Sequence, residues 1–170
     1  MKAFSYFSIL FLTAATGCPD ILAADRAPNI ILIFIDDMGY ADIGPFGSTL
    51  NRTPNLDRMA DEGMRLTSFY AAPLCTQSRA ALMTGSYPIR TGLMHGTWHP
   101  VLMPGDAHGI NPDEITIAEI LKEKGYATSC IGKWHLGFGE KSPNWNGKLK
   151  PGPLEVGFDY YFGVPVVNSH

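Results

Sequence analysis

Apolar residues along this chain gather in three short runs, and helical patterns lie between them. Residues 29–35 read Asn-Ile-Ile-Leu-Ile-Phe-Ile, a continuous run typical of a strand that is buried on both faces. Residues 64–70 and 126–131 predict two further strands. The alternation of strands with helices predicts an α/β fold, in which helices flank a mostly parallel sheet.

Two of the intervening helices have recognisable ends. Thr53 is predicted to cap the first, Pro54 to take its first position and Gly63 to end it. The second is predicted to open at Asn111-Pro112-Asp113-Glu114, where Asn111 caps and the glutamate follows three residues later. Its core face would consist of Ile117, Ala118, Ile120 and Leu121, and Gly125 would end it.

A third, shorter helix is predicted over residues 79–83, with Ser78 as its N-cap and Gly85 as its stop. Cys75 then lies just before a helix N-terminus, where unpaired N–H groups favour negative charge. If the turn continues back through Cys75, Arg79 shares its face. A cysteine, a helix start and an arginine suit a nucleophile that handles an oxyanion. The alternative is a buried cysteine with a packing role only.

Polar residues of two further kinds follow the other predicted strands. Asp36 and Asp37 end the run at 29–35, and adjacent carboxylates repel each other unless a cation lies between them. Such hard oxygen ligands favour calcium or magnesium. The alternative is that the two aspartates lie in a solvated loop and bind no metal.

Lys133 and His135 follow residues 126–131, and in extended backbone both would project to one side. A fixed cation beside an imidazole can hold an anion and move a proton, whereas the alternative is a surface turn.

The stretch from Gly92 to Ile110 is rich in glycine, proline and histidine and shows neither helical nor alternating pattern. It is predicted to be a loop that lines the substrate site. Because ligands bind outside the carboxyl ends of parallel strands, the three groups of polar residues are expected to converge at one edge of the sheet.

Composition and charge exclude several classes of protein. The chain has 170 residues, about one domain's worth, and its net charge is −3 with 17% charged residues. These values exclude a polybasic nucleic-acid-binding protein and a disordered acidic tail. The three cysteines, Cys18, Cys75 and Cys130, are too few and too scattered for a disulfide scaffold or a zinc knuckle.

Residues 1–24 have the pattern of a signal peptide. Lys2 precedes an apolar run over residues 4–15, and small residues at Ala23-Ala24 offer a cleavage site. The run is too short for a transmembrane helix. A lipoprotein signal ending at Cys18 is the alternative, and either signal predicts export to the periplasm or beyond the cell. Residues 25–170 would then form the mature chain.

Three motifs together resemble those of the type I sulfatases, the formylglycine-dependent, arylsulfatase A-like branch of the alkaline phosphatase superfamily. The first is Cys75-Thr76-Gln77-Ser78-Arg79, followed by an apolar run and Thr84-Gly85. The second is Asp36-Asp37-Met38-Gly39, and the third is Gly132-Lys133-Trp134-His135-Leu136-Gly137. One position departs from the family, which usually has proline, or sometimes alanine, where this chain has Gln77.

The resemblance implies a fold like that of alkaline phosphatase and the sulfatases, and a role for each matching residue. A maturation enzyme would oxidise Cys75 to formylglycine, whose hydrated aldehyde is the family's nucleophile. Asp36, Asp37 and the modified Cys75 would bind one calcium ion. Arg79 and Lys133 would neutralise charge, and His135 would transfer protons. Lys133 and, at the end of the chain, Ser169 would contact the substrate.

By this resemblance the activity would be sulfatase, the hydrolysis of aryl, glycan or lipid O-sulfate esters. The chain would be the N-terminal part of a catalytic domain, truncated, inactive alone and prone to aggregate. One alternative is a formylglycine-dependent phosphonate or phosphodiester hydrolase. Another is an inactive remnant that binds calcium or sulfated glycan, if Gln77 prevents oxidation of Cys75.

Overall fold

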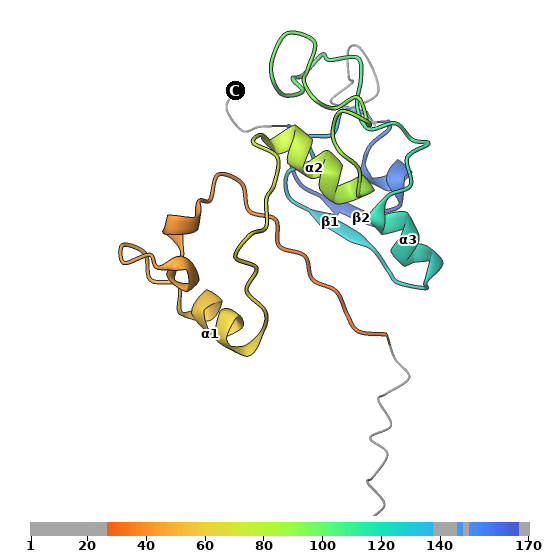
Figure 1. Ribbon diagram of the computed structural model, residues 1–170. Coiled ribbons are helices and arrows are strands. Elements are labelled where there is room, and N and C mark those ends of the chain that lie inside the picture. Colours follow the sequence, from red (N-terminus) through yellow and green to blue (C-terminus); the bar gives the residue numbers. More distant parts are fainter. Residues whose placement is uncertain (1–26, 138–145, 148–149, 167–170) are drawn as a thin grey trace, which may run out of the picture. The chain divides into compact units, whose positions relative to one another are not determined.

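The structure is a computed structural model that describes residues 27–137, 146–147 and 150–166 (Figure 1). The predicted signal peptide, Cys18 and Ser169 lie outside these residues, and what was predicted for them stays a prediction. The residues up to Ile35 and those from Asp36 onward form two separate units.

Two of the three predicted strands are absent from the part of the chain that the structure describes. Residues 29–35 form neither helix nor strand, and Ile31 and Ile33 are 86% and 71% exposed. Residues 64–70 also lack regular structure, and Tyr70 is 87% exposed. The prediction of buried strands here is wrong because an apolar run becomes a strand only where a neighbouring strand pairs its backbone. No described strand pairs with either run.

The first predicted helix is confirmed as α1 (Pro54–Glu62), which follows two short 3-10 helices, η1 (Tyr40–Asp42) and η2 (Gly44–Phe46). Thr53 stands at the N-cap position, Pro54 opens the helix and Gly63 follows its end. The hydroxyl of Thr53 does not cap the helix, however. It accepts a hydrogen bond from the backbone N–H of Gly44 (2.8 Å) and donates one to Asp57 (3.2 Å).

Helix α2 (Cys75–Thr84) starts earlier than predicted. Its N-cap is Leu74, whose carbonyl accepts from the N–H of Ser78 at 3.0 Å. The prediction of Ser78 as N-cap is therefore wrong: this residue lies inside the helix, and its hydroxyl donates to the Ala72 carbonyl (2.7 Å). Gly85 ends the helix with a φ of 63°, as predicted from the freedom of glycine in the left-handed region.

Helix α3 (Ile117–Glu123) starts later than predicted. Asn111 and Glu114 close a turn of their own, in which the Glu114 N–H donates to the Asn111 carbonyl (3.0 Å). The helix is capped instead by Thr116 and Glu119, whose side chains each accept from the other's backbone N–H. The sequence contains two capping signals here, and the second one forms the helix. Of the predicted core face only Ala118 is buried.

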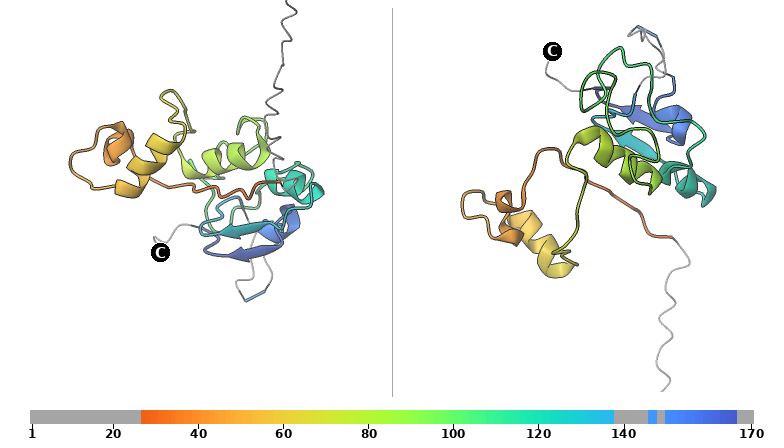
Figure 2. Two further views of the ribbon diagram at one scale, coloured as in Figure 1. Left: turned by 90° about the horizontal axis from the view of Figure 1, so that it is seen from below. Right: turned by 45° about the horizontal axis from the view of Figure 1, so that its top comes forward.

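The third predicted strand is present but shorter, as β1 (Ser129–Ile131). It pairs in parallel with β2 (Tyr160–Phe162), with Cys130 opposite Tyr161. A 3-10 helix, η3 (Pro153–Val156), precedes β2. Helices α2 and α3 lie on one face of this sheet (Figure 2). The described residues thus contain a parallel two-stranded sheet flanked by helices.

A small apolar core fills the space between the helices and the sheet. Trp134 packs edge-on against Phe158, with ring centroids 6.5 Å apart. The buried apolar residues of this core are Ala80, Met83, Leu93, Leu102, Ile110, Ala118, Trp134, Leu136 and Val156.

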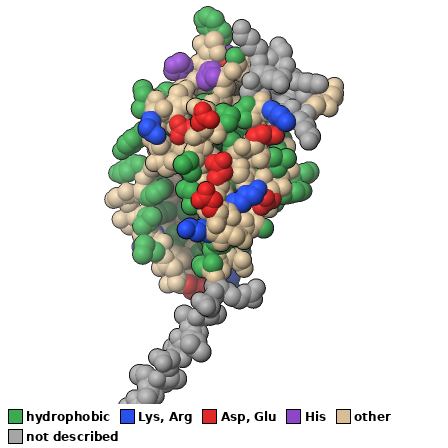
Figure 3. All heavy atoms as spheres, turned by 90° about the vertical axis from the view of Figure 1, so that its right-hand side faces the viewer, with side chains coloured by type: hydrophobic (Ala, Val, Ile, Leu, Met, Phe, Trp, Pro, Cys, Tyr) green, Lys and Arg blue, Asp and Glu red, His purple; other side chains and the backbone are tan. Residues whose placement is uncertain are grey.

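The face of the molecule in Figure 3 shows acidic and basic side chains interspersed, with hydrophobic side chains exposed between them.

Candidate active site

The first turn of α2 presents Cys75 and Arg79 on one side of the helix. Cys75 is the first residue of α2 and Arg79 lies four residues further on, so the two side chains share a face. The N–H groups of this first turn have no partners within the helix, and they give its N-terminus a partial positive charge. The helix therefore offers a thiol and a guanidinium at an end that favours anions.

The segment after β1 brings Lys133 and His135 to the same place. The N–H of Trp134 donates to the Val164 carbonyl (2.9 Å) and that of His135 to the Pro165 carbonyl (2.8 Å), which fixes the backbone. His135 has a φ of 55°, so the extended backbone predicted here ends before it. Among the described residues only His135 and Asp37 are non-glycine residues with positive φ. Such conformations cost free energy and cluster at functional sites.

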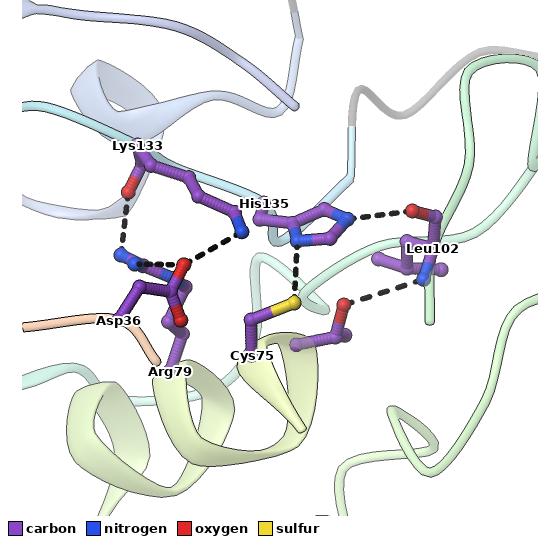
Figure 4. A network of polar contacts seen from close by, with 7 residues as sticks. Asp36, Cys75, Arg79, Leu102, Lys133 and His135 are labelled. Atoms are coloured by element: carbon purple, nitrogen blue, oxygen red, sulfur yellow. Dashed lines mark hydrogen bonds and ion pairs between the residues drawn. The ribbon is translucent and has the colours of Figure 1, made fainter. Parts of the chain in front are cut away.

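One carboxylate and two cations form the charged half of the site (Figure 4). Asp36 Oδ2 lies 2.7 Å from Lys133 Nζ and 3.3 Å from Arg79 Nη2. Arg79 also donates from Nη1 to the Lys133 carbonyl (2.6 Å), which ties α2 to the segment after β1. Burial raises the pKa of Asp36, but the hydrogen bond and charge of Lys133, with the charge of Arg79, outweigh it and leave this pKa lowered.

A thiol and an imidazole form the other half. His135 Nδ1 lies 3.1 Å from Cys75 Sγ, and His135 Nε2 lies 2.6 Å from the Leu102 carbonyl oxygen. Because a carbonyl oxygen only accepts, Nε2 must carry the proton and Nδ1 is the acceptor that faces Cys75. Burial lowers the pKa of His135, and the charges of Lys133 and Arg79 lower it further. The imidazole is therefore neutral at pH 7, as a proton acceptor must be.

Five predicted site residues thus come together from three separate segments: Asp36, Cys75, Arg79, Lys133 and His135. Asp37 is exposed, and among the described residues it makes no hydrogen bond or ion pair with this group. Leu102 was missed by sequence reasoning because it contributes only its backbone carbonyl, for which a leucine gives no signal.

The donor atoms fit part of a calcium site. Asp36 and Asp37 supply the hard carboxylate oxygens that calcium prefers, but calcium takes roughly six to eight ligands. The described residues contain no group of three or more histidine, cysteine, aspartate or glutamate side chains placed to hold a metal. The remaining ligands would therefore have to come from outside these residues.

Comparison with known proteins identifies the family. Residues 28–169 match the Sulfatase family profile. The chain belongs to the sulfatase family. It is 45% identical over 170 residues to steryl-sulfatase of Mus musculus, with 94% of this chain and 27% of the relative covered. It is 44% identical over 157 residues to arylsulfatase A of Homo sapiens, with 92% and 28% covered.

The fold is that of the sulfatases as well. The crystal structure of the PsFucS1 sulfatase from Pseudoalteromonas sp. matches with a TM-score of 0.67 and 42% identity. This match covers 85% of the present chain and 27% of the other. The chain therefore spans less than a third of the length of these family members. The part of the chain that the structure describes contains no helix with the length and hydrophobicity of a membrane span.

Proposed function

We propose that the protein containing this chain is a sulfatase that hydrolyses O-sulfate esters, and that residue 75 acts as formylglycine. The main support is the contact between Cys75 Sγ and the acceptor nitrogen of a buried, neutral His135 (3.1 Å). The family's substrates carry a tetrahedral sulfate anion, and Arg79 and Lys133 provide two fixed positive charges in the same site.

The chemistry that the family adds to these residues is a hydrated aldehyde at position 75 as nucleophile and a calcium ion that polarises the sulfate oxygens. Of the residues described, Asp36 and Asp37 would contribute to holding that ion. Asp36 is at present the counter-ion of Arg79 and Lys133. With its negative charge shared with a cation, the two basic side chains would be available to pair with sulfate instead.

Proton transfer and charge stabilisation would be carried out by side chains of this chain. His135 Nδ1 is placed to accept a proton from a hydroxyl at position 75. Arg79 and Lys133 would stabilise the negative charge that develops as the S–O bond breaks. Their charges are preorganised, because Arg79 is fixed to the Lys133 carbonyl (2.6 Å) before any substrate binds.

We also propose the localisation, the maturation and the substrate contacts that the resemblance implies. The protein would be exported, in soluble form or as a lipoprotein anchored through Cys18, and would need a formylglycine-generating maturation enzyme. Lys133 and Ser169 would contact the substrate, an aryl, glycan or lipid sulfate. The activity is assigned to the longer protein, because the chain spans 27–28% of its curated relatives.

A phosphonate or phosphodiester hydrolase of the same superfamily is a second candidate. The observation in its favour is that Arg79 and Lys133 recognise a tetrahedral anion by charge alone, and charge does not select sulfur over phosphorus.

The test is an assay of the full-length protein on matched aryl sulfate, aryl phosphonate and aryl phosphodiester substrates. The proposal predicts preference for the sulfate and loss of turnover in Cys75→Ala. Cys130→Ala is the matched control, since Cys130 is a second free cysteine that lies on β1 and packs against the apolar core. Preference for a phosphorus substrate would favour the second candidate, and full activity of Cys75→Ala would rule out both.

A further inference from the structure

The loop over residues 94–102 is fastened to the first turn of α2 by the two residues that follow Cys75. The Thr76 hydroxyl accepts from the N–H of Leu102 at 3.3 Å. Gln77 Nε2 donates to the carbonyl of Pro100 (2.7 Å) and to that of Met94. Thr76 is 0% and Gln77 3% exposed, so these hydrogen bonds are shielded from competing water.

This attachment bears directly on the imidazole of the site. Leu102 is held through its N–H by Thr76, and its carbonyl accepts from His135 Nε2 at 2.6 Å. The imidazole is 0% exposed, so water cannot replace this acceptor. The position of one backbone carbonyl therefore decides which ring nitrogen carries the proton and leaves Nδ1 as the acceptor at residue 75.

We propose that Thr76 and Gln77 are positioning residues for His135. By holding the loop, they keep the Leu102 carbonyl on Nε2 and so keep the unprotonated Nδ1 facing the nucleophile. The catalytic part of this inference rests on the proposed sulfatase function. The structural part, the tautomer of His135, does not.

The inference gives a role to the one position that departs from the family motif. The family usually has proline or alanine where this chain has Gln77, and neither of those side chains can donate a hydrogen bond. In this chain the carboxamide makes two such bonds, and its Oε1 is buried without a partner among the described residues. A buried polar atom left unpaired costs free energy, so the two bonds that accompany it must compensate for that cost.

The experiment compares four variants of the full-length protein: Thr76→Val, Thr76→Ser, Gln77→Met and Gln77→Glu. Valine keeps the shape of threonine without the hydroxyl, whereas serine keeps the hydroxyl. Methionine keeps the length of glutamine without donors, and an ionised glutamate removes the donors and adds a charge next to two carbonyls. Because these positions lie in the maturation motif, kcat is normalised to the fraction of chains that carry the aldehyde.

Two measurements are made on each variant. Nitrogen-15 NMR of labelled histidine, assigned with His135→Gln, reports which ring nitrogen is protonated, and steady-state kinetics give kcat and KM. The proposal predicts that Thr76→Val and Gln77→Met lose the uniform Nε2–H signature and about tenfold in normalised kcat, with KM little changed. Thr76→Ser should retain both, and Gln77→Glu should behave like Gln77→Met or worse.

Two outcomes would overturn the proposal: an unchanged tautomer in folded Thr76→Val and Gln77→Met, or an unchanged normalised kcat in both. If either variant fails to fold, the other decides the result. If the parent protein hydrolyses no sulfate ester, the proposed function fails, but the NMR result still decides whether these residues fix the tautomer.

Discussion

The described chain divides at the start of α2 into two regions that differ in burial. None of the described residues before Thr76 is buried, whereas every buried residue lies from Thr76 onward. The sequences are not correspondingly different, since residues 29–35 are as apolar as any core segment. An apolar pattern therefore shows what a segment could bury, and burial itself depends on the partners that surround it.

The same division runs through the candidate active site. The second region supplies Cys75's histidine partner, the two cations and the loop carbonyl, all on a packed framework. The first region supplies Asp36, whose side chain is one-third exposed and is held by charged hydrogen bonds from Lys133 and Arg79. The imidazole is thus fixed within the packed core, whereas the carboxylate is held at the surface of that core by its two charged partners.

The largest expected effect is on stability, in a pair of matched substitutions. Leu136 is 1% exposed and Ile31 is 86% exposed. In the 170-residue chain, Leu136→Ala should lower the free energy of unfolding by about 2–5 kcal/mol through lost burial and a cavity. Ile31→Ala should change it by less than about 0.5 kcal/mol. Chemical denaturation measures both.

Equal losses from the two substitutions in this chain would contradict the difference in burial between Leu136 and Ile31. The same pair can also be measured in a longer protein. There, a large cost of Ile31→Ala would show that polypeptide beyond this sequence covers residues 29–35.

The next effect is on catalysis. Lys133→Met removes one of the two cations while keeping the length of the side chain, and should lower kcat/KM of the full-length protein about a hundredfold. Lys124→Met is the control, because Lys124 is an exposed residue at the end of α3. If both variants lose activity equally, a fixed charge at Lys133 has no special role in turnover.

The smallest effect concerns an exposed ion pair within the packed region. The hydrogen bond from Lys122, with those from Thr128, lowers the pKa of Asp159 from its ordinary 3.8 to about 2. A carboxyl whose pKa is lowered on folding stabilises the fold above the unfolded pKa and loses that contribution as pH falls through the folded pKa. Asp159→Asn should therefore be slightly destabilising at pH 7 and neutral below about pH 2.

Unfolding measured across pH tests this, with high salt as a second variable, since screening should reduce the difference near neutral pH. A difference between Asp159→Asn and the parent that does not depend on pH would contradict the assignment.

Local signals in the sequence predicted helix ends well where one signal was present. Pro54 opens α1 and Gly63 follows its end as expected, and Gly85 ends α2, although the hydroxyl of Thr53 does not cap α1. Where two signals competed, the sequence alone did not decide. The pattern at Asn111 was predicted to cap the helix, but Thr116 is the cap, and its hydroxyl also donates to the Val156 carbonyl (2.7 Å), a contact made only in the folded chain.

Strands were predicted less well, since pairing is not a local property. Of residues 126–131 only Ser129–Ile131 form β1, because Tyr160–Phe162 pairs with them, and that partner was not predicted as a strand. For the site, the sequence indicated which side chains could carry chemistry but not their neighbours. The Leu102 carbonyl and the Thr76 hydroxyl, which together orient His135, could not be distinguished from any other buried groups before folding.

The most direct test is the mass of the peptide that contains residue 75, isolated from the exported full-length protein. The account predicts that sulfur and two hydrogens of the Cys75 side chain have been replaced by one oxygen, leaving an aldehyde that reacts with hydrazides. An intact thiol in a preparation that hydrolyses sulfate esters would contradict it.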